Sequence, residues 1–140
     1  MQIEIRAFKS GDEKAVIRLW HDCGLVVPDN DPLKDIQRKQ GEHPELFLVA
    51  VGDGEIVGTV MGGYEGHRGW VNYLAVAPIQ RKTGIGKMLM KDIEARLLKM
   101  GCPKINLQVR ETNADVRTFY EKIGYAQDKV ISYGKRLIKN

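Results

Sequence analysis

The stretch Val76-Ala77-Pro78-Ile79-Gln80-Arg81-Lys82-Thr83-Gly84-Ile85-Gly86 decides the fold of this 140-residue sequence. It lies between an apolar segment, residues 70–76, that is typical of a strand and a periodic segment that predicts a long helix. Gly84 and Gly86 lack a Cβ, so a ligand can approach the backbone closely. A helix start presents unpaired N–H groups at the positive end of its dipole. The stretch therefore predicts a phosphate-binding turn, with an arginine and a lysine at its rim.

Two common nucleotide-binding motifs do not fit this turn. The phosphate loop of NTPases needs G-x-x-x-x-G-K-[ST], but Arg81 stands at the first glycine and Met88 follows Gly86-Lys87. A dinucleotide-binding fingerprint needs a small residue where Leu89 stands. Taken alone, Gly84-x-Gly86 is also compatible with an ordinary turn between a strand and a helix.

Length and composition predict one domain over residues 1–140. Apolar residues make up 43% and charged residues 29% of the chain, which is ordinary for a globular protein. The longest plain apolar run, residues 46–51, is far shorter than the ~20 residues that span a bilayer, so no membrane association is expected. The N-terminal residues alternate in polarity and do not resemble a signal peptide. We therefore expect a cytoplasmic protein.

The cysteines, histidines and charges exclude several other classes. Cys23 and Cys102 are expected at helix ends, away from the motifs, and predict neither a disulfide framework nor a covalent intermediate. The three histidines are scattered without metal-ligand spacing, so no metal is expected. A net charge of +4 and a pI near 9.1 suit an anionic ligand. Without a platform of basic and aromatic residues, they do not predict nucleic-acid binding.

Hydrophobic periodicity and turn signals predict the element order β-α-α-β-β-β-α-β-α-β. This order indicates an α/β protein with a mixed sheet and helices on its faces. The expected strands cover residues 3–7, 46–51, 55–63, 70–76, 104–110 and 130–138, and the expected helices cover residues 10–23, 32–40, 85–100 and 113–123.

A second motif gives the turn a more specific meaning. Residues 76–86 read V-x-P-x-x-R-x-x-G-x-G, and residues 113–125 read N-x-x-x-x-x-F-Y-E-K-x-G-Y. Together they resemble the GNAT superfamily of N-acetyltransferases, and the order of elements resembles that fold over the whole chain. Residues 62–69 are most similar to small bacterial acetyltransferases. The resemblance implies a mostly antiparallel mixed sheet with splayed central strands and helices on both faces.

The resemblance also implies a cofactor site for acetyl-CoA. The turn would wrap the pyrophosphate with its backbone N–H groups, and the preceding strand would hydrogen-bond the pantetheine arm through its main chain. Asn113 would contact the pantetheine region, and Tyr120 would protonate the departing thiolate. The implied cofactor-binding residues are Leu74, Ala75, Val76, Arg81, Lys82, Thr83, Gly84, Ile85, Gly86 and Asn113.

The chemistry of a phenol fits the role that the resemblance implies for Tyr120. The conjugate acid of a thiolate has a pKa of roughly 8.5, whereas the pKa of a phenol is about 10. A phenol is therefore protonated at neutral pH and can donate to a developing thiolate. Tyr120 also continues the apolar stripe of residues 116–123, so a core role is the alternative.

Two positions depart from the family pattern. Lys82 stands where family members commonly carry glycine, which predicts a less tight first turn. Gln108 stands where relatives that acetylate protein N-termini often place a glutamate as general base. A glutamine cannot accept a proton at useful pH, so the base is unassigned. Glu65 and His67, in the loop before the central strand, are the candidates we name, and Glu111 and Tyr73 are further ones.

The acceptor is expected to be a primary amine, which attacks the thioester directly in a ternary complex; a protein N-terminus, a lysine and a small amine all stay open. A site without a strong base favours an α-amine, with a pKa of about 7.7–8.0, over a free lysine near about 10.4. The alternative is a catalytically weak acyl-CoA-binding sensor or interaction module of the same fold. A homodimer is also compatible with the sequence.

Overall fold

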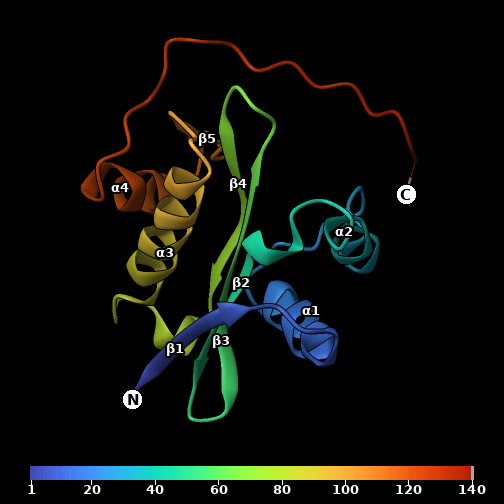
Figure 1. Ribbon diagram of the computed structural model, residues 1–140, viewed down its shortest axis with the longest axis vertical. Helices are drawn as coiled ribbons and strands as arrows, with labels where there is room; N and C mark the ends of the chain where they lie inside the picture. The colour runs from blue at the N-terminus through green and yellow to red at the C-terminus, as the bar shows by residue number, and fades with distance from the viewer. Residues whose placement is uncertain (140) are drawn as a thin grey trace. The chain divides into compact units, whose positions relative to one another are not determined.

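The computed structural model describes residues 1–139 (Figure 1). Contacts between Cα atoms divide them into two compact units, Met1–Leu107 and the residues from Gln108 onward. Each unit is described by itself below. The first unit holds the whole sheet and three of the helices, and the second holds α4 (Ala114–Lys122). That residues 1–140 form a single domain stays a prediction.

The first unit is built on a five-stranded sheet in the order β1-β2-β3-β4-β5. The strands are β1 (Ile3–Ala7), β2 (Phe47–Gly52), β3 (Glu55–Tyr64), β4 (Gly69–Val76) and β5 (Ile105–Leu107). The first three neighbouring pairs are antiparallel, and β4 and β5 are parallel. The predicted mixed, mostly antiparallel sheet is confirmed.

The hairpin between β2 and β3 forms where the sequence places it. Gly52 pairs with Glu55, and the two residues between them, Asp53 and Gly54, have φ angles of 51° and 77°. Two successive positive φ angles are typical of a type I′ turn, which matches the twist of the flanking strands.

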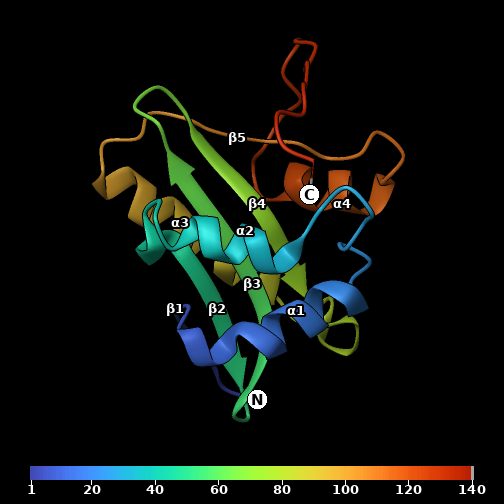
Figure 2. The same cartoon turned by 90° about the vertical axis from the view of Figure 1, so that its right-hand side faces the viewer.

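Helices cover both faces of the sheet, as predicted. Figure 2 shows α1 (Glu13–Asp22) and α2 (Pro32–Lys39) across one face, with α3 (Ile85–Lys99) behind the sheet. The alternation of side chains along β3 explains this arrangement. Thr59 faces α1, where it accepts a hydrogen bond from Trp20, whereas a Cβ at Gly62 would meet Ile93 of α3 at 2.7 Å. A side chain at Gly62 would therefore force the Ile93 side chain of α3 to shift.

The two faces carry separate groups of buried side chains. The core under α1 and α2 consists of Val16, Leu19, Trp20, Ile36, Phe47, Val49, Met61 and Ala75. The apolar face of α3 is buried through Ile85, Leu89, Met90, Ile93 and Leu97. The buried residues that come from the helices recur at helical spacing, which is why the sequence predicts these helices.

Two predicted strands differ from the structure. The strand expected over residues 104–110 is limited to Ile105–Leu107, because β4 pairs with it only through Gly69–Val71. The strand expected over residues 130–138 does not form, because those residues have no ladder partner in the part of the chain that is described. Alternating apolar residues are insufficient without a neighbouring strand to satisfy the backbone. Tyr133 and Leu137 are accordingly 91% and 87% exposed.

Candidate acetyl-CoA site

The predicted phosphate-binding turn follows β4 directly. A 3₁₀ turn, Pro78–Gln80, leads into exposed residues 81–84, and α3 begins at Ile85. Gly84 has a φ of 91°, and Thr83 donates its hydroxyl to the carbonyl of Gln80. Lys82 has a φ of 65°, which is the left-handed conformation that glycine adopts easily and lysine rarely. Lys82 thus takes the glycine-like conformation itself. A less tight first turn at this position stays a prediction.

Backbone donors gather where this turn becomes α3. The first N–H groups of a helix have no partner within it, and Gly84, which precedes α3, supplies no side-chain cap. Ile85 is buried, so its side chain anchors the helix start and only its backbone remains for a ligand. Lys82 and Lys87 are exposed nearby in the sequence. This is the arrangement that favours a bound phosphate.

Arg81 connects the turn back to β4. Its Nε donates to the carbonyl of Val76 at 3.3 Å. This contact fixes the base of the guanidinium group against the end of the strand that leads into the turn. A positive charge is thereby held at the junction between β4 and the donor-rich helix start.

The second half of β4 has an open edge. Its pairing with β5 ends at Val71, so within the described residues no strand lies along that edge beside Leu74–Val76. On the other edge, the amide of Ala77 donates to Val57 of β3 at 2.8 Å. Backbone groups alternate between the two edges of a strand, so the amide of Val76 faces the open edge. The predicted splay between the central strands is confirmed.

Cys23 lies closer to the motif than the sequence predicted. Its Sγ donates to the same Val76 carbonyl at 3.3 Å, so this thiol lies beside β4 and not away from the motifs. Gly24, the next residue, has a φ of 71° and follows the end of α1. Cys102 is buried and donates to the carbonyl of Lys104 at 3.4 Å. Both cysteines are free.

Glu65 and His67 lie in the exposed loop before β4. The Oε1 of Glu65 accepts the backbone N–H groups of Arg68 and of His67, the latter at 2.7 Å. These two bonds lower the pKa of the carboxyl, so Glu65 is a weaker base than usual. The length of β4, roughly 25 Å at 3.3 Å per residue, separates this loop from the Arg81–Gly86 turn.

The second unit contains the remaining predicted residues. The Oδ1 of Asn113 accepts the amide of Val116 at 3.2 Å, so this side chain caps α4 and retains its NH₂ group as a donor. The side chain of Gln108 donates to the hydroxyl of Ser132. Tyr120, on α4, packs edge-on against the rings of Phe119 and Tyr125, with centroid distances of 5.1 and 5.6 Å.

Burial raises the pKa of Tyr120 to about 12. Because the unfolded phenol titrates near 10, the folded protein holds this proton more tightly than the unfolded chain does. The contribution of this proton to the free energy of unfolding is present below pH 10 and is lost as the pH rises toward 12. Between pH 9 and pH 11 we expect the free energy of unfolding of the Tyr120→Phe variant to fall by about 1.3 kcal/mol less than that of wild type. Urea unfolding at pH 9 and pH 11 measures the difference, and an equal loss in both proteins would contradict it.

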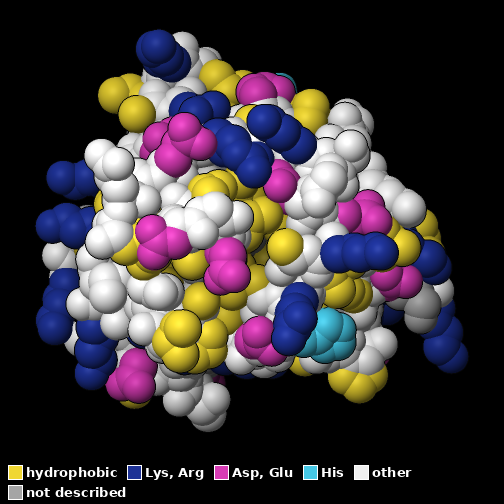
Figure 3. Space-filling view, turned by 90° about the horizontal axis from the view of Figure 1, so that it is seen from below, with side chains coloured by type: hydrophobic (Ala, Val, Ile, Leu, Met, Phe, Trp, Pro, Cys, Tyr) yellow, Lys and Arg dark blue, Asp and Glu magenta, His cyan; other side chains and the backbone are white. Residues whose placement is uncertain are grey.

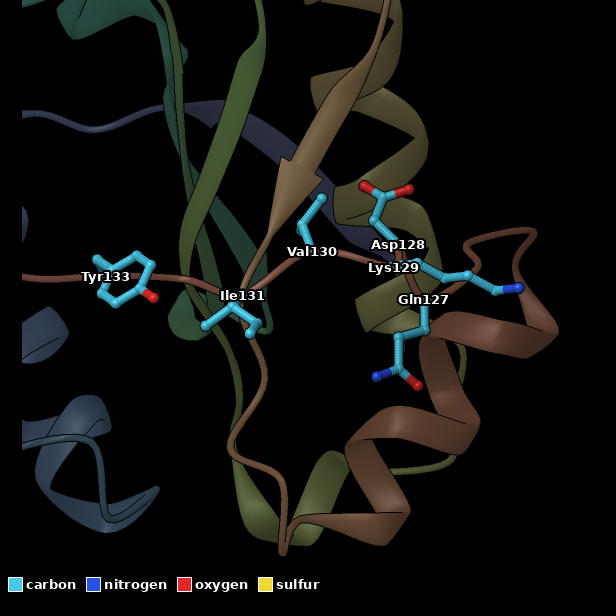
Figure 4. Close-up of a pocket in the computed structure, with 6 residues that line it drawn as sticks. All are labelled: Gln127, Asp128, Lys129, Val130, Ile131 and Tyr133. Atoms are coloured by element: carbon cyan, nitrogen blue, oxygen red, sulfur yellow. The ribbon is translucent and has the colours of Figure 1, made fainter.

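A pocket lies within the second unit. Figure 4 shows that it is lined by the extended segment after α4, through Gln127, Asp128, Lys129, Val130, Ile131 and Tyr133. None of the predicted site residues lines it.

On the face seen in Figure 3, lysine and arginine side chains lie beside acidic and hydrophobic ones. Among residues 1–139, no helix is long and apolar enough to cross a membrane.

One polar group beside β4 is not indicated by the sequence. Asp35 of α2 accepts a hydrogen bond from the hydroxyl of Tyr73 on β4 at 2.6 Å. Pro32 and Asp31 mark the start of α2, but no local motif shows that this helix lies over β4. The helical position of Asp35 beside the buried Ile36 was the available signal.

The fold and the turn together define an α/β protein with an uncapped helix start beside an open strand edge. The family model for the acetyltransferase (GNAT) family matches residues 13–125. An acetyltransferase of Pectobacterium atrosepticum is 51% identical over 138 residues, which cover 99% of this chain and 98% of that protein. The chain therefore belongs to the GNAT family of acetyltransferases. It is an N-acetyltransferase, and acetyl-CoA is its co-substrate.

Solved structures show the same fold at low sequence identity. The aminoglycoside N-acetyltransferase AAC(6')-Iy, in complex with a bisubstrate analogue, has a TM-score of 0.80 at 18% identity. That match covers 97% of this chain and 99% of the other. A ribosomal-protein-alanine N-acetyltransferase from Escherichia coli has a TM-score of 0.75 at 20% identity, covering 88% of this chain and 77% of the other.

Proposed function

We propose that this protein transfers the acetyl group of acetyl-CoA to a primary amine by direct attack in a ternary complex. The observation that carries the proposal is the open edge of β4 leading into the Arg81–Gly86 turn. An extended ligand with a phosphate at one end fits this arrangement, because its arm can pair with the strand while the phosphate reaches the helix start.

The residues present fit acetyl-CoA in chemical type. Leu74, Ala75 and Val76 would pair with the pantetheine arm through the main chain, and Asn113 would donate to the same region. The turn would hold the pyrophosphate through its backbone N–H groups and the charges of its arginine and lysine. The residues assigned to the pyrophosphate are Arg81, Lys82, Thr83, Gly84, Ile85 and Gly86.

Two groups of the chain would promote the reaction. Bound acetyl-CoA supplies an activated thioester carbonyl. The amide of Val76, on the open edge, would donate to the carbonyl oxygen as negative charge develops there. Tyr120 would give its phenolic proton to the sulfur as the carbon–sulfur bond breaks and the carbon–nitrogen bond forms. The nitrogen would lose its proton to solvent or to a base.

The choice of acceptor follows from base strength. Because Glu65 is engaged with backbone amides and Gln108 cannot act as a base, we favour an amine that is already partly neutral near pH 7. An α-amine of a peptide or small molecule meets this condition better than a lysine side chain. A base role for Glu65 or His67 stays a prediction. So do a homodimer and a cytoplasmic location.

The first experiment is thermal unfolding with acetyl-CoA, with ATP and NAD as controls. Ligand at about 100 times its dissociation constant stabilises the folded state by ~2.7 kcal/mol. For a chain of this size the midpoint temperature of thermal unfolding should rise by about 10 °C. We expect the rise with acetyl-CoA and with neither control. A midpoint that does not move with acetyl-CoA would contradict the proposed site.

A second experiment separates an enzyme from an acyl-CoA-binding module. Thiol release from acetyl-CoA is followed with four amines, and the acetylated product is identified by mass. The amines are a peptide with a free N-terminus, an N-terminally blocked peptide with one lysine, spermidine and an aminoglycoside. The enzyme is expected to acetylate the free N-terminus faster than the blocked peptide. If the protein bound acetyl-CoA but acetylated none of the four amines, the result would favour the acyl-CoA-binding module.

A further inference from the structure

A β-bulge lies in β4 at the start of the stretch assigned to the pantetheine arm. Thr59 of β3 pairs with Ala75, and Met61 pairs with Asn72. One residue of β3 therefore lies opposite two residues of β4, Tyr73 and Leu74. The extra residue bends the strand and re-aims the backbone that follows it. The bulge thus sets the direction of the Leu74–Val76 backbone.

Tyr73 occupies an unfavourable conformation at this bulge. Its φ is 51°, in the left-handed region that a bulky side chain rarely adopts. Such a residue persists only where its surroundings over-determine it. The surroundings here must therefore hold both the backbone and the ring of Tyr73.

Three contacts hold Tyr73, each from a different element. Its carbonyl accepts the hydroxyl of Thr59 at 2.8 Å, and that hydroxyl in turn accepts the indole N–H of Trp20 at 2.9 Å. Its ring stacks on Trp20 with a centroid distance of 3.8 Å. Its hydroxyl donates to Asp35 Oδ2 at 2.6 Å. Thr59 and Trp20 are fully buried, so the network has little freedom to rearrange.

Asp35 is the part of this network supplied by α2. One turn further along the same helix, the buried amine of Lys39 donates to the carbonyl of Gly62 on β3. The inner face of α2 therefore attaches to two strands through polar groups as well as through Ile36. A carboxylate that accepts a phenol makes a stronger and more directional bond than two neutral partners do.

We propose that Asp35, acting through Tyr73, is a positioning residue for acetyl transfer: it holds the β4 bulge so that the backbone of Leu74–Val76 points at the thioester. This inference rests on the proposed function, which assigns that backbone to the pantetheine arm and the amide of Val76 to the thioester carbonyl oxygen. Asp35 itself touches no reacting atom. Removing the Asp35 carboxylate should impair the chemical step more than the binding of acetyl-CoA. The reason is that the Arg81–Gly86 turn, which would hold the pyrophosphate, follows the bulge in the chain and makes no contact with Asp35 in this network.

The test is a double-mutant cycle of Asp35→Ala and Tyr73→Phe in the full chain. Each change removes the same hydrogen bond, and Tyr73→Phe keeps the ring that stacks on Trp20. Each is expected to lower kcat with the best amine of the panel by about tenfold to a hundredfold. The double variant should be no slower than the slower single variant. Asp35→Asn, whose side-chain oxygen can still accept the phenol, should restore most of the activity.

A measurement without an acceptor makes the test independent of turnover. The carbonyl ¹³C resonance of bound [1-¹³C]acetyl-CoA reports hydrogen bonds to its oxygen. We expect a downfield position in wild type and a return toward the free value in Asp35→Ala, with the dissociation constant little changed. A resonance and a kcat that both stay as in wild type would overturn the positioning role.

The control variant is Asp31→Ala. Asp31 caps the same helix, and its side chain accepts the amide of Lys34 at 3.1 Å. This change weakens α2 without touching the bond to Tyr73, so kcat and the resonance should stay near wild type. If Asp31→Ala reproduced the Asp35→Ala effects, Asp35 would act only by stabilising the helix, and the proposal would be wrong. If wild type failed to bind acetyl-CoA, the proposed function would fail first, and the inference with it.

Discussion

Replacing Tyr120 with phenylalanine is expected to lower kcat by about 10²- to 10⁴-fold while leaving the affinity for acetyl-CoA unchanged. The phenol is buried, and its pKa of about 12 keeps it protonated at every pH at which the enzyme would work. The variant removes only the proton donor and keeps the ring that packs against Phe119 and Tyr125. The measurement combines steady-state kinetics with calorimetric titration of acetyl-CoA.

The matched control is Tyr133→Phe. This tyrosine is 91% exposed and belongs to the segment after α4, so its hydroxyl should be dispensable. Equal turnover in wild type and Tyr120→Phe would refute the acid role and leave Tyr120 as a core residue. A loss of turnover in Tyr133→Phe as large as in Tyr120→Phe would show that the assay is not specific to the donor.

The second large effect is expected from Gly84→Val. Gly84 precedes α3 with a φ of 91°, and a Cβ there meets no atom within 4 Å. The substitution therefore acts through backbone strain of about 1–3 kcal/mol and through the loss of close approach by a ligand. Losing one hydrogen bond to a charged phosphate costs ~1.5–3 kcal/mol. The dissociation constant for acetyl-CoA should rise by at least about tenfold.

Gly101→Val is the control for this prediction. Gly101 follows the other end of the same helix with a φ of 86°, and a Cβ there also meets nothing within 4 Å. The two variants should lose similar thermal stability, but only Gly84→Val should lose affinity in calorimetric titrations. Equal affinity in both variants would remove the turn from the cofactor site.

The fold was predictable because its signals are local. The turn at Gly52–Glu55, the stripe of α3 and the glycines around α3 each depend on nearby residues, and each led to the correct element. The strand expected over residues 130–138 failed because a strand needs a partner, and an alternating pattern does not specify one.

The site was predictable where it depends on the backbone of one segment, and much less where it depends on contacts between distant segments. The turn at Gly84 and its donors follow from the sequence of one strand and one helix. The contact between Cys23 and Val76 joins residues 53 positions apart, and Asp35 and Tyr73 are 38 apart. No spacing rule brings such pairs together; the packing of α1 and α2 on β4 does.

Direct transfer in a ternary complex requires both substrates to be bound before any product leaves, and the pattern of initial rates distinguishes this mechanism from transfer through the protein. Initial rates of CoA release are measured while acetyl-CoA and the best amine of the panel are varied together. We expect intersecting double-reciprocal lines and no acetyl group on the protein itself. Parallel lines, with an acetyl group on Cys23 beside Val76 that vanishes in Cys23→Ala, would contradict it and point to a covalent acetyl-enzyme.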